Sequence, residues 1–129
     1  MKPKKFSIID RLQSFGYAFS GLLKFFKQEH NARIHLVAIC IVLPLGWYFK
    51  LNRLDWSFLL IAIALVIITE LINTAVETIC DLVEPNYNEA VKDTKDFAAG
   101  ATLMAALVSF IIGIMVFAPK IWDLPYFND

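Results

Sequence analysis

Three long apolar stretches constrain this chain more than any other feature of its sequence. They cover residues 36–49, 56–69 and 97–118, and none of them contains an Asp, Glu, Lys or Arg. Only the third is, by itself, close to the roughly 20 residues that a helix needs to cross a ~30 Å hydrocarbon core. The first two must borrow polar neighbours to span a membrane, which predicts functional polar groups at membrane depth.

The composition agrees with a membrane protein. Hydrophobic residues make up 58% of the 129 residues and the mean hydropathy is +0.59, which is too apolar for an ordinary soluble domain. We therefore expect an all-α integral membrane protein in which residues 1–129 form a single domain. The expected elements are an interfacial amphipathic helix over 6–33 and membrane-spanning helices over 34–50, 54–84 and 90–118.

The charges are unevenly distributed and predict an orientation. Residues 1–35 contain seven Lys and Arg against two acids, whereas the linker over 50–55 contains two basic residues and the segment after Pro119 contains one. By the positive-inside rule the N-terminus lies in the cytoplasm. Three spans then place the C-terminus outside and the loop over 78–96 inside.

The expected surface helix has apolar residues at helical spacing, together with basic residues that attract anionic lipid. The apolar positions are Leu12, Phe15, Phe19, Leu22, Leu23 and Phe26. A helix packed on a soluble core has a similar pattern, and that alternative stays open here. Pro44 predicts a kink or an early break in the first span, and Pro119 is expected to end the third.

A polar ladder follows the second apolar stretch and consists of Glu70, Asn73, Glu77 and Asp81. At about 100° per residue these four side chains share one stripe of a helix. If Trp56 marks the outer boundary, Glu70 lies roughly 21 Å deep and Glu77 roughly 31 Å deep. Glu70 then suits a general base acting on an interfacial hydroxyl, and Glu77 suits Mg²⁺ held jointly with phosphate oxygens. The plain alternative is a paired carboxylate used for packing between helices.

Two further clusters are expected at the same rim. Glu29 lies near the end of the surface helix with Arg33 one turn on, where a simple i,i+4 pair is the alternative. Lys95 and Asp96 precede a small-residue face, "AAGA", and would complete a phosphoryl-transfer site. The chain contains no GxxxxGK[ST] or kinase signature, so a nucleotide site has to be built from helix faces.

The segments "SFGYAFSGL", "EHNARIH", "ELINTAVE", "DLVEPNY" and "KDTKDFAAGA" together resemble the prokaryotic diacylglycerol kinase family, small three-span lipid kinases that include undecaprenol kinase. The resemblance extends over residues 11–119. It implies a homotrimer in the bacterial cytoplasmic (inner) membrane, with active sites shared between subunits. It also implies that MgATP phosphorylates a lipid alcohol at the cytoplasmic surface.

The resemblance also implies a role for particular residues. Glu70 looks like the catalytic base, and Glu29 and Glu77 look like Mg²⁺ ligands. The implied nucleotide-binding residues are Tyr17, Glu29, Asn73, Glu77, Tyr87, Lys95 and Asp96. The implied lipid-substrate residues are Ser14, Phe15, Asn31, Arg33, Trp56, Glu70 and Ala99.

Two questions of function stay open at this stage. "DFAAGA" resembles the undecaprenol kinase branch, so undecaprenol is the favoured substrate and diacylglycerol the alternative. A small oligomeric cation channel or transporter subunit is the rival from another class, but its carboxylates would be expected near the bilayer midplane and not at one edge. Without a basic, aromatic-interleaved patch on a soluble fold, no nucleic-acid partner is expected.

Overall fold

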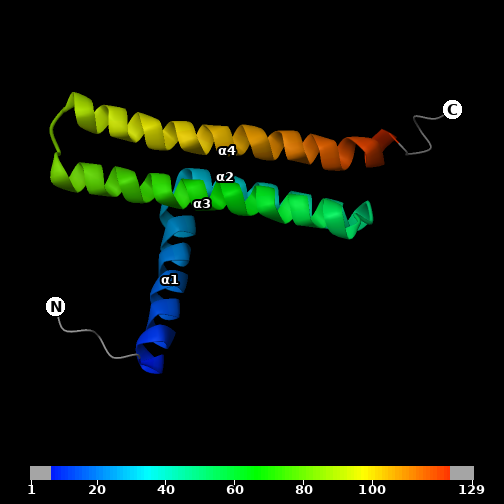
Figure 1. Cartoon of the computed structure of the whole chain (residues 1–129), viewed down its shortest axis with the longest axis horizontal. Coiled ribbons are helices and arrows are strands. Elements are labelled where there is room, and N and C mark those ends of the chain that lie inside the picture. Colours follow the sequence, from blue (N-terminus) through cyan, green and yellow to red (C-terminus); the bar gives the residue numbers. More distant parts are fainter. Residues whose placement is uncertain (1–6, 123–129) are drawn as a thin grey trace.

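The computed structural model describes residues 7–122 and shows four helices within them. They are α1 (Ile8–Gln28), α2 (His30–Tyr48), α3 (Arg53–Val83) and α4 (Glu89–Trp122). Figure 1 shows α3 and α4 side by side and running in opposite directions, with α2 along α3 and α1 projecting away from the other three helices. α2, α3 and α4 are long and apolar enough to cross a membrane, with peak mean hydropathies of 1.3, 2.4 and 2.5. The all-α, three-span prediction is confirmed.

Asparagine caps explain where the two longest helices begin. The Asn52 side-chain oxygen accepts the backbone N–H groups of Leu54 and Asp55 at 2.8 and 2.9 Å. The Asn88 side-chain oxygen accepts the N–H of Ala90 at 2.9 Å. Because the first N–H groups of a helix have no partner within it, such caps fix the start of α3 and of α4.

The lengths of the helices differ, and the difference positions the polar residues. At 1.5 Å per residue, the 31 residues of α3 and the 34 of α4 are about 46 and 51 Å long, against about 28 Å for the 19 residues of α2. Both long helices therefore exceed a ~30 Å hydrocarbon core. The loop over 84–88 joins them, so their polar extensions lie next to each other at one end.

The corner between α1 and α2 differs from the sequence expectation of one helix over 6–33. α1 ends at Gln28, and Glu29 adopts an extended backbone with φ −84° and ψ 128°. The Glu29 N–H still closes α1 by donating to the Phe25 carbonyl at 2.9 Å. Residues 30–33 consequently form the first turn of α2. No Gly or Pro marks this corner, so no local sequence signal predicts it.

Neither helix-internal proline ends its helix. α2 continues through Pro44 to Tyr48, so the expected early break does not occur. α4 continues through Pro119 to Trp122, which corrects the expectation that the third helix ends at this proline. A proline removes one intrahelical bond, and Pro119 is close enough to the helix end that few later bonds depend on that turn.

The apolar core lies at the end of the bundle that is remote from the polar extensions. Leu51, Leu59 and Val116 form its buried centre. The α2–α3 turn closes over it, with Lys50 at φ 51° and the Leu51 N–H donating to the Gly46 carbonyl at 3.1 Å. A Cβ on Gly46 would lie 2.9 Å from Cη2 of Trp56, so only glycine permits this close packing.

Candidate active site

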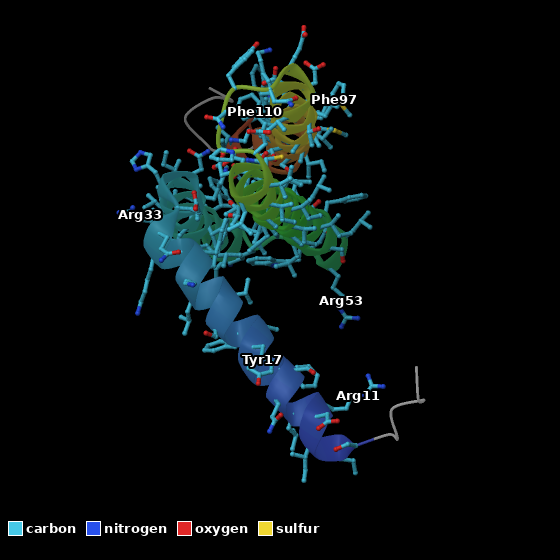
Figure 2. All side chains as sticks on the ribbon, turned by 90° about the vertical axis from the view of Figure 1, so that its left-hand side faces the viewer. Arg11, Tyr17, Arg33, Arg53, Phe97 and Phe110 are labelled. Atoms are coloured by element: carbon cyan, nitrogen blue, oxygen red, sulfur yellow. The ribbon has the colours of Figure 1, made fainter. Side chains whose placement is uncertain are left out.

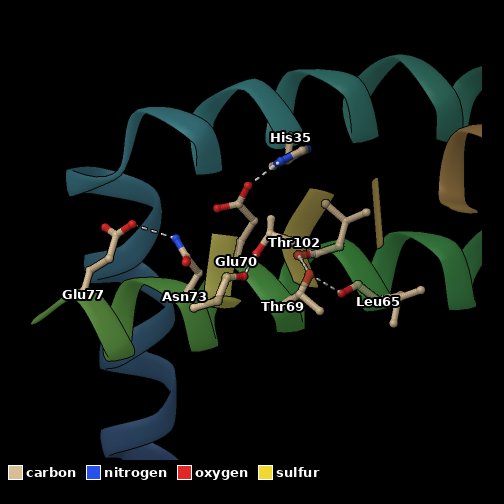
Figure 3. A network of polar contacts seen from close by, with 9 residues as sticks. His35, Leu65, Thr69, Glu70, Asn73, Glu77 and Thr102 are labelled. Carbon is tan, nitrogen blue, oxygen red and sulfur yellow. Dashed lines mark hydrogen bonds and ion pairs between the residues drawn. The ribbon is translucent and has the colours of Figure 1, made fainter. Parts of the chain in front are cut away.

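Glu70 is the buried charged residue of the described chain, with 5% of its surface exposed. Its Oε1 lies 3.0 Å from Nε2 of His35, which belongs to α2 (Figure 3). A carboxylate only accepts hydrogen bonds, so His35 donates when Glu70 is ionised. Sequence reasoning missed His35 as a functional residue. The available signal was an ionisable side chain at the start of an apolar span, which is by default a functional candidate.

Asn73 and Glu77 form the next contact along the predicted stripe of α3. The Asn73 Nδ2 donates to the Glu77 Oε1 at 3.0 Å (Figure 3). The Asn73 Oδ1 is buried and has no hydrogen-bond partner within the described chain. A buried polar atom without a partner calls for an explanation, and a ligand is one. Carboxylate and amide oxygens are also the donors that Mg²⁺ prefers, so this pair fits the implied cation.

Two ion pairs lie at the ends of α3 and α4. Lys95 of α4 pairs with Asp81 of α3, and Lys92 pairs with Asp96 at 2.9 Å. The sequence predicted Lys95 and Asp96 as neighbours in one site, whereas the structure gives each a different partner. The four side chains line a cavity of about 270 Å³ together with loop residues 84–88. Because exposed ion pairs are weak, these lysines can exchange a carboxylate for a phosphate at small cost.

Glu29 lies at the corner between α1 and α2 and is partly exposed. Its backbone carbonyl accepts a hydrogen bond from Nε of Arg33 at 3.4 Å, so Arg33 contacts the backbone of Glu29 and not, as the plain alternative had it, the carboxylate. Within residues 7–122 no three His, Cys, Asp or Glu side chains cluster as a metal site. A cation held by Glu29 and Glu77 therefore needs further oxygens, which phosphate and water supply in phosphoryl-transfer sites.

The predicted residues of α1 lie apart from this polar end. Tyr17 and Phe15 are 75% and 74% exposed, and the Ser14 hydroxyl donates to the Asp10 carbonyl of its own helix at 2.8 Å. Figure 2 shows Tyr17 well down α1, away from α3 and α4. One chain does not bring these three residues to Glu70.

The remaining predicted residues divide between the two ends of the bundle. Tyr87 is 84% exposed in the loop that lines the 270 Å³ cavity, near Lys95. Asn31 and Arg33 are exposed in the first turn of α2, and Ala99 is exposed on α4. Trp56 instead packs against Gly46 at the other end of α3, roughly 21 Å along the helix from Glu70.

The chemistry available at the polar end is therefore specific. A buried carboxylate with a histidine donor can accept a proton, a wetter carboxylate beside a free amide oxygen can hold a cation, and paired lysines can bind anions. These three groups occur in order along α3 and at the start of α4. The order suits transfer of a phosphoryl group to a hydroxyl at a membrane surface.

Comparison with known proteins gives consistent matches. Residues 16–117 match the family described as prokaryotic diacylglycerol kinase. Undecaprenol kinase of Bacillus subtilis is 35% identical over 109 residues, which cover 84% of this chain and 89% of that protein. A diacylglycerol kinase of Synechocystis sp. is 37% identical over 114 residues, covering 88% of this chain and 65% of that protein. The Escherichia coli diacylglycerol kinase is 26% identical over 100 residues, covering 78% and 82%. The described helices α2 and α3 fall wholly within the matched residues, and the chain belongs to the prokaryotic diacylglycerol kinase family.

Proposed function

We propose that this chain is an ATP-dependent lipid kinase that transfers the γ-phosphoryl group of MgATP to the hydroxyl of a membrane lipid alcohol. The observation that carries the proposal is Glu70, a buried carboxylate with a donor at 3.0 Å on a helix long and apolar enough to span a membrane. The names of the relatives, undecaprenol kinase and diacylglycerol kinase, support the same reaction.

In the proposed reaction Glu70 acts on the lipid. Its carboxylate accepts the proton of the lipid hydroxyl while that oxygen forms a bond to the γ-phosphorus. The bond between the γ-phosphorus and the β,γ-bridging oxygen breaks, and ADP leaves. At roughly 21 Å along α3 from Trp56, Glu70 lies near the inner edge of a ~30 Å core, where a lipid hydroxyl is found.

The nucleotide is proposed to occupy the neighbouring turns. Glu77 and Glu29 would hold Mg²⁺, and the Asn73 Oδ1, which has no hydrogen-bond partner among residues 7–122, would add a further oxygen. When bound, Mg²⁺ would neutralise negative charge on the phosphate oxygens of the nucleotide. Lys95 would bind phosphate after leaving Asp81. Asp96, Tyr87 and Tyr17 complete the proposed nucleotide site.

The proposal includes a homotrimer with shared active sites, because one chain leaves some of the predicted site residues apart. Tyr17 lies well down α1, away from α3 and α4 (Figure 2), and Ser14 and Phe15 precede it on the same helix. α4 also exposes large apolar side chains along its length, including Leu103, Leu107 and Phe110 at 62%, 53% and 68%. Such a surface needs lipid or another helix against it.

We place the exposed α1 on the inner leaflet of the bacterial cytoplasmic membrane, with the N-terminus cytoplasmic and the C-terminus external.

Undecaprenol is the proposed substrate. The match to undecaprenol kinase covers 89% of that protein, whereas the match to the Synechocystis diacylglycerol kinase covers 65% of its length. Diacylglycerol is the second candidate, because that relative is 37% identical to this chain.

The experiment measures transfer of radiolabelled γ-phosphate to lipid by the purified full chain in mixed micelles. Undecaprenol and a diacylglycerol are compared at equal surface concentration, with Mg²⁺ present or chelated. We expect Mg²⁺-dependent phosphorylation with a higher kcat/KM for undecaprenol. A higher kcat/KM for diacylglycerol would reverse the choice of substrate. Absence of transfer to either lipid would overturn the kinase and favour the channel alternative.

A further inference from the structure

We infer that His35 is a positioning residue, which holds the Glu70 carboxylate in its working orientation by donating a hydrogen bond from Nε2. The inference rests on the proposed function, because it assigns Glu70 as the base. It adds a residue of α2 to a site that the sequence placed on α3 and α4. Three observations support it, namely the burial of Glu70, the geometry of the contact and the surroundings of the histidine.

Burial makes Glu70 dependent on a partner. A carboxylate with 5% of its surface exposed loses most of its hydration, and an ionised group in such a place needs a donor. Among the described residues, the side-chain contact recorded for Glu70 is the one to His35 at 3.0 Å. Without it, the carboxylate is left with no fixed donor in the place where it must work.

The contact fixes the carboxylate across two helices. His35 and Glu70 lie 35 residues apart in the sequence and belong to α2 and α3. The polar neighbours of Glu70 on α3 are engaged elsewhere: Thr69 donates to the Leu65 carbonyl at 3.0 Å, and Asn73 donates to Glu77 (Figure 3). The rotamer of Glu70 is therefore set by α2 and not by its own helix.

The contact also leaves one carboxylate oxygen for the reaction. His35 engages Oε1, and no hydrogen bond among residues 7–122 is recorded for Oε2. A general base needs a free oxygen within hydrogen-bond reach of the hydroxyl that it deprotonates. One oxygen anchored and the other free is the arrangement that a positioned base requires.

The surroundings of His35 strengthen the bond. The ring lines a cavity of about 570 Å³ between α2, α3 and α4, whose other lining residues include Ile39, Ile63 and Ile67. In apolar surroundings a hydrogen bond is electrostatically stronger than in water. His35 thus lies between this apolar cavity and Glu70, the buried carboxylate of the described chain.

A rival reading exchanges the two roles. Histidine would be the base and Glu70 would orient it, as the carboxylate does in Ser-His-Asp triads. Glutamine distinguishes the readings, because its side-chain Nε2 can donate near the position of the histidine Nε2 but cannot take up a proton. His35→Gln preserves a positioning residue and destroys a base.

The experiment compares five proteins with wild type: His35→Ala, His35→Gln, Glu70→Gln, the double variant His35→Ala/Glu70→Gln and Ile39→Ala. The last truncates the wall of the same cavity one helical turn away and controls for packing. For each protein we measure kcat, KM for the lipid, MgATP affinity and oligomer size. A misplaced catalytic group can lose roughly 10²-fold in rate, so His35→Ala should lower kcat by about that factor with MgATP affinity unchanged.

Three results are expected to accompany that loss. His35→Gln should recover most of the lost kcat, and Ile39→Ala should stay within about twofold of wild type. The double variant should be no slower than Glu70→Gln, because a residue that acts through Glu70 has nothing left to position.

Contrary results separate this inference from the proposed function. If Glu70→Gln keeps its rate, the assignment of the base fails and the inference fails with it. If Glu70→Gln loses its rate but His35→Ala does not, only the inference is overturned. A His35→Gln protein as slow as His35→Ala, or a double variant that loses a further factor of about 10², would likewise exclude a positioning role.

Discussion

The two ends of the α2–α4 bundle follow different rules. At the packed end, which comprises residues 46–63 and 112–117, apolar side chains converge on Leu59 and Val116, and glycine is required at the closest approach. At the polar end, residues 70–96, the buried side chain is a carboxylate and the Asn73 Oδ1 is buried without a partner. The packed end also holds a buried oxygen without a hydrogen bond, the Asp55 Oδ2, but that oxygen lies 3.6 Å from Nζ of Lys120 in an ion pair. The Asn73 Oδ1 has no such partner among residues 7–122, and it lies at the end where the substrates are proposed to bind.

This difference predicts a separation of effects. Substitutions at the polar end should change catalysis or ligand affinity with little effect on stability. Substitutions at the packed end should change stability with little effect on catalysis. A variant that crossed this division would show that the two ends do not have separate roles.

The largest effect is expected for Glu70→Gln. The substitution is nearly isosteric and removes the base, so kcat should fall by roughly 10²–10⁴-fold, the usual contribution of general acid–base catalysis. MgATP affinity should stay close to wild type, because Glu70 is proposed to act on the lipid. Steady-state kinetics in mixed micelles with direct nucleotide binding provide the test. A variant that kept its rate, or lost its nucleotide instead, would refute the assignment.

The second effect is expected for Glu77→Gln. Losing one charge-assisted contact to a cation corresponds to ~1.5–3 kcal/mol, so MgATP affinity should fall by about 10- to 100-fold. Turnover should be nearly abolished at ordinary Mg²⁺ concentrations while the protein keeps its oligomer size. Asp93→Asn, an exposed acid of α4 at the same end, is the control and should bind MgATP normally. Unchanged Mg²⁺ activation in Glu77→Gln would exclude it as a ligand.

The third effect concerns the packed end. A Cβ on Gly46 would meet Trp56 Cη2 at 2.9 Å, and overpacking of this kind typically costs about 1–3 kcal/mol. Replacing a glycine inside a helix by alanine gains about 1 kcal/mol in helix propensity, so the cost equals or exceeds the gain. Gly46→Ala should therefore unfold at lower denaturant concentration than wild type and keep its kcat. Gly113→Ala is the matched control, because no atom lies within 4 Å of its added Cβ. Gly46→Ala as stable as Gly113→Ala would contradict the packing argument.

The sequence predicted the three long apolar helices, because hydropathy and helical period are local properties. It missed the corner at Glu29 and the continuation of α4 through Pro119, since both depend on the backbone conformation of single residues. The stripe of α3 was also predictable, because it follows from the helical period alone. What the period cannot supply is the partner on another helix, which is why His35 was missed.

Pairings at the polar end were unpredictable for the same reason. Lys95 and Asp96 are neighbours in sequence, yet Lys95 pairs with Asp81 across the loop and Asp96 pairs with Lys92 one turn away. Adjacent residues on a helix point about 100° apart, so they rarely share a partner. The α1 residues illustrate a further limit, because the proposed shared site would need a second chain to bring Tyr17 near Glu70.

The smallest effect is expected for Asp81→Asn, and its sign is informative. Asp81 pairs with Lys95, and its side chain is 69% exposed, so removal of this surface ion pair should leave stability unchanged within error. If Lys95 must leave Asp81 to bind phosphate, the substitution removes a competitor and should tighten MgATP binding. The gain should be at most about five-fold, the size expected for an exposed pair.

Lys95→Met is the matched variant and should weaken binding, because it removes the cation itself. Isothermal titration of each protein with MgATP measures both changes. Weaker binding by Asp81→Asn would mean that Asp81 assists the nucleotide, and that the pair is part of the site and not a competitor for it.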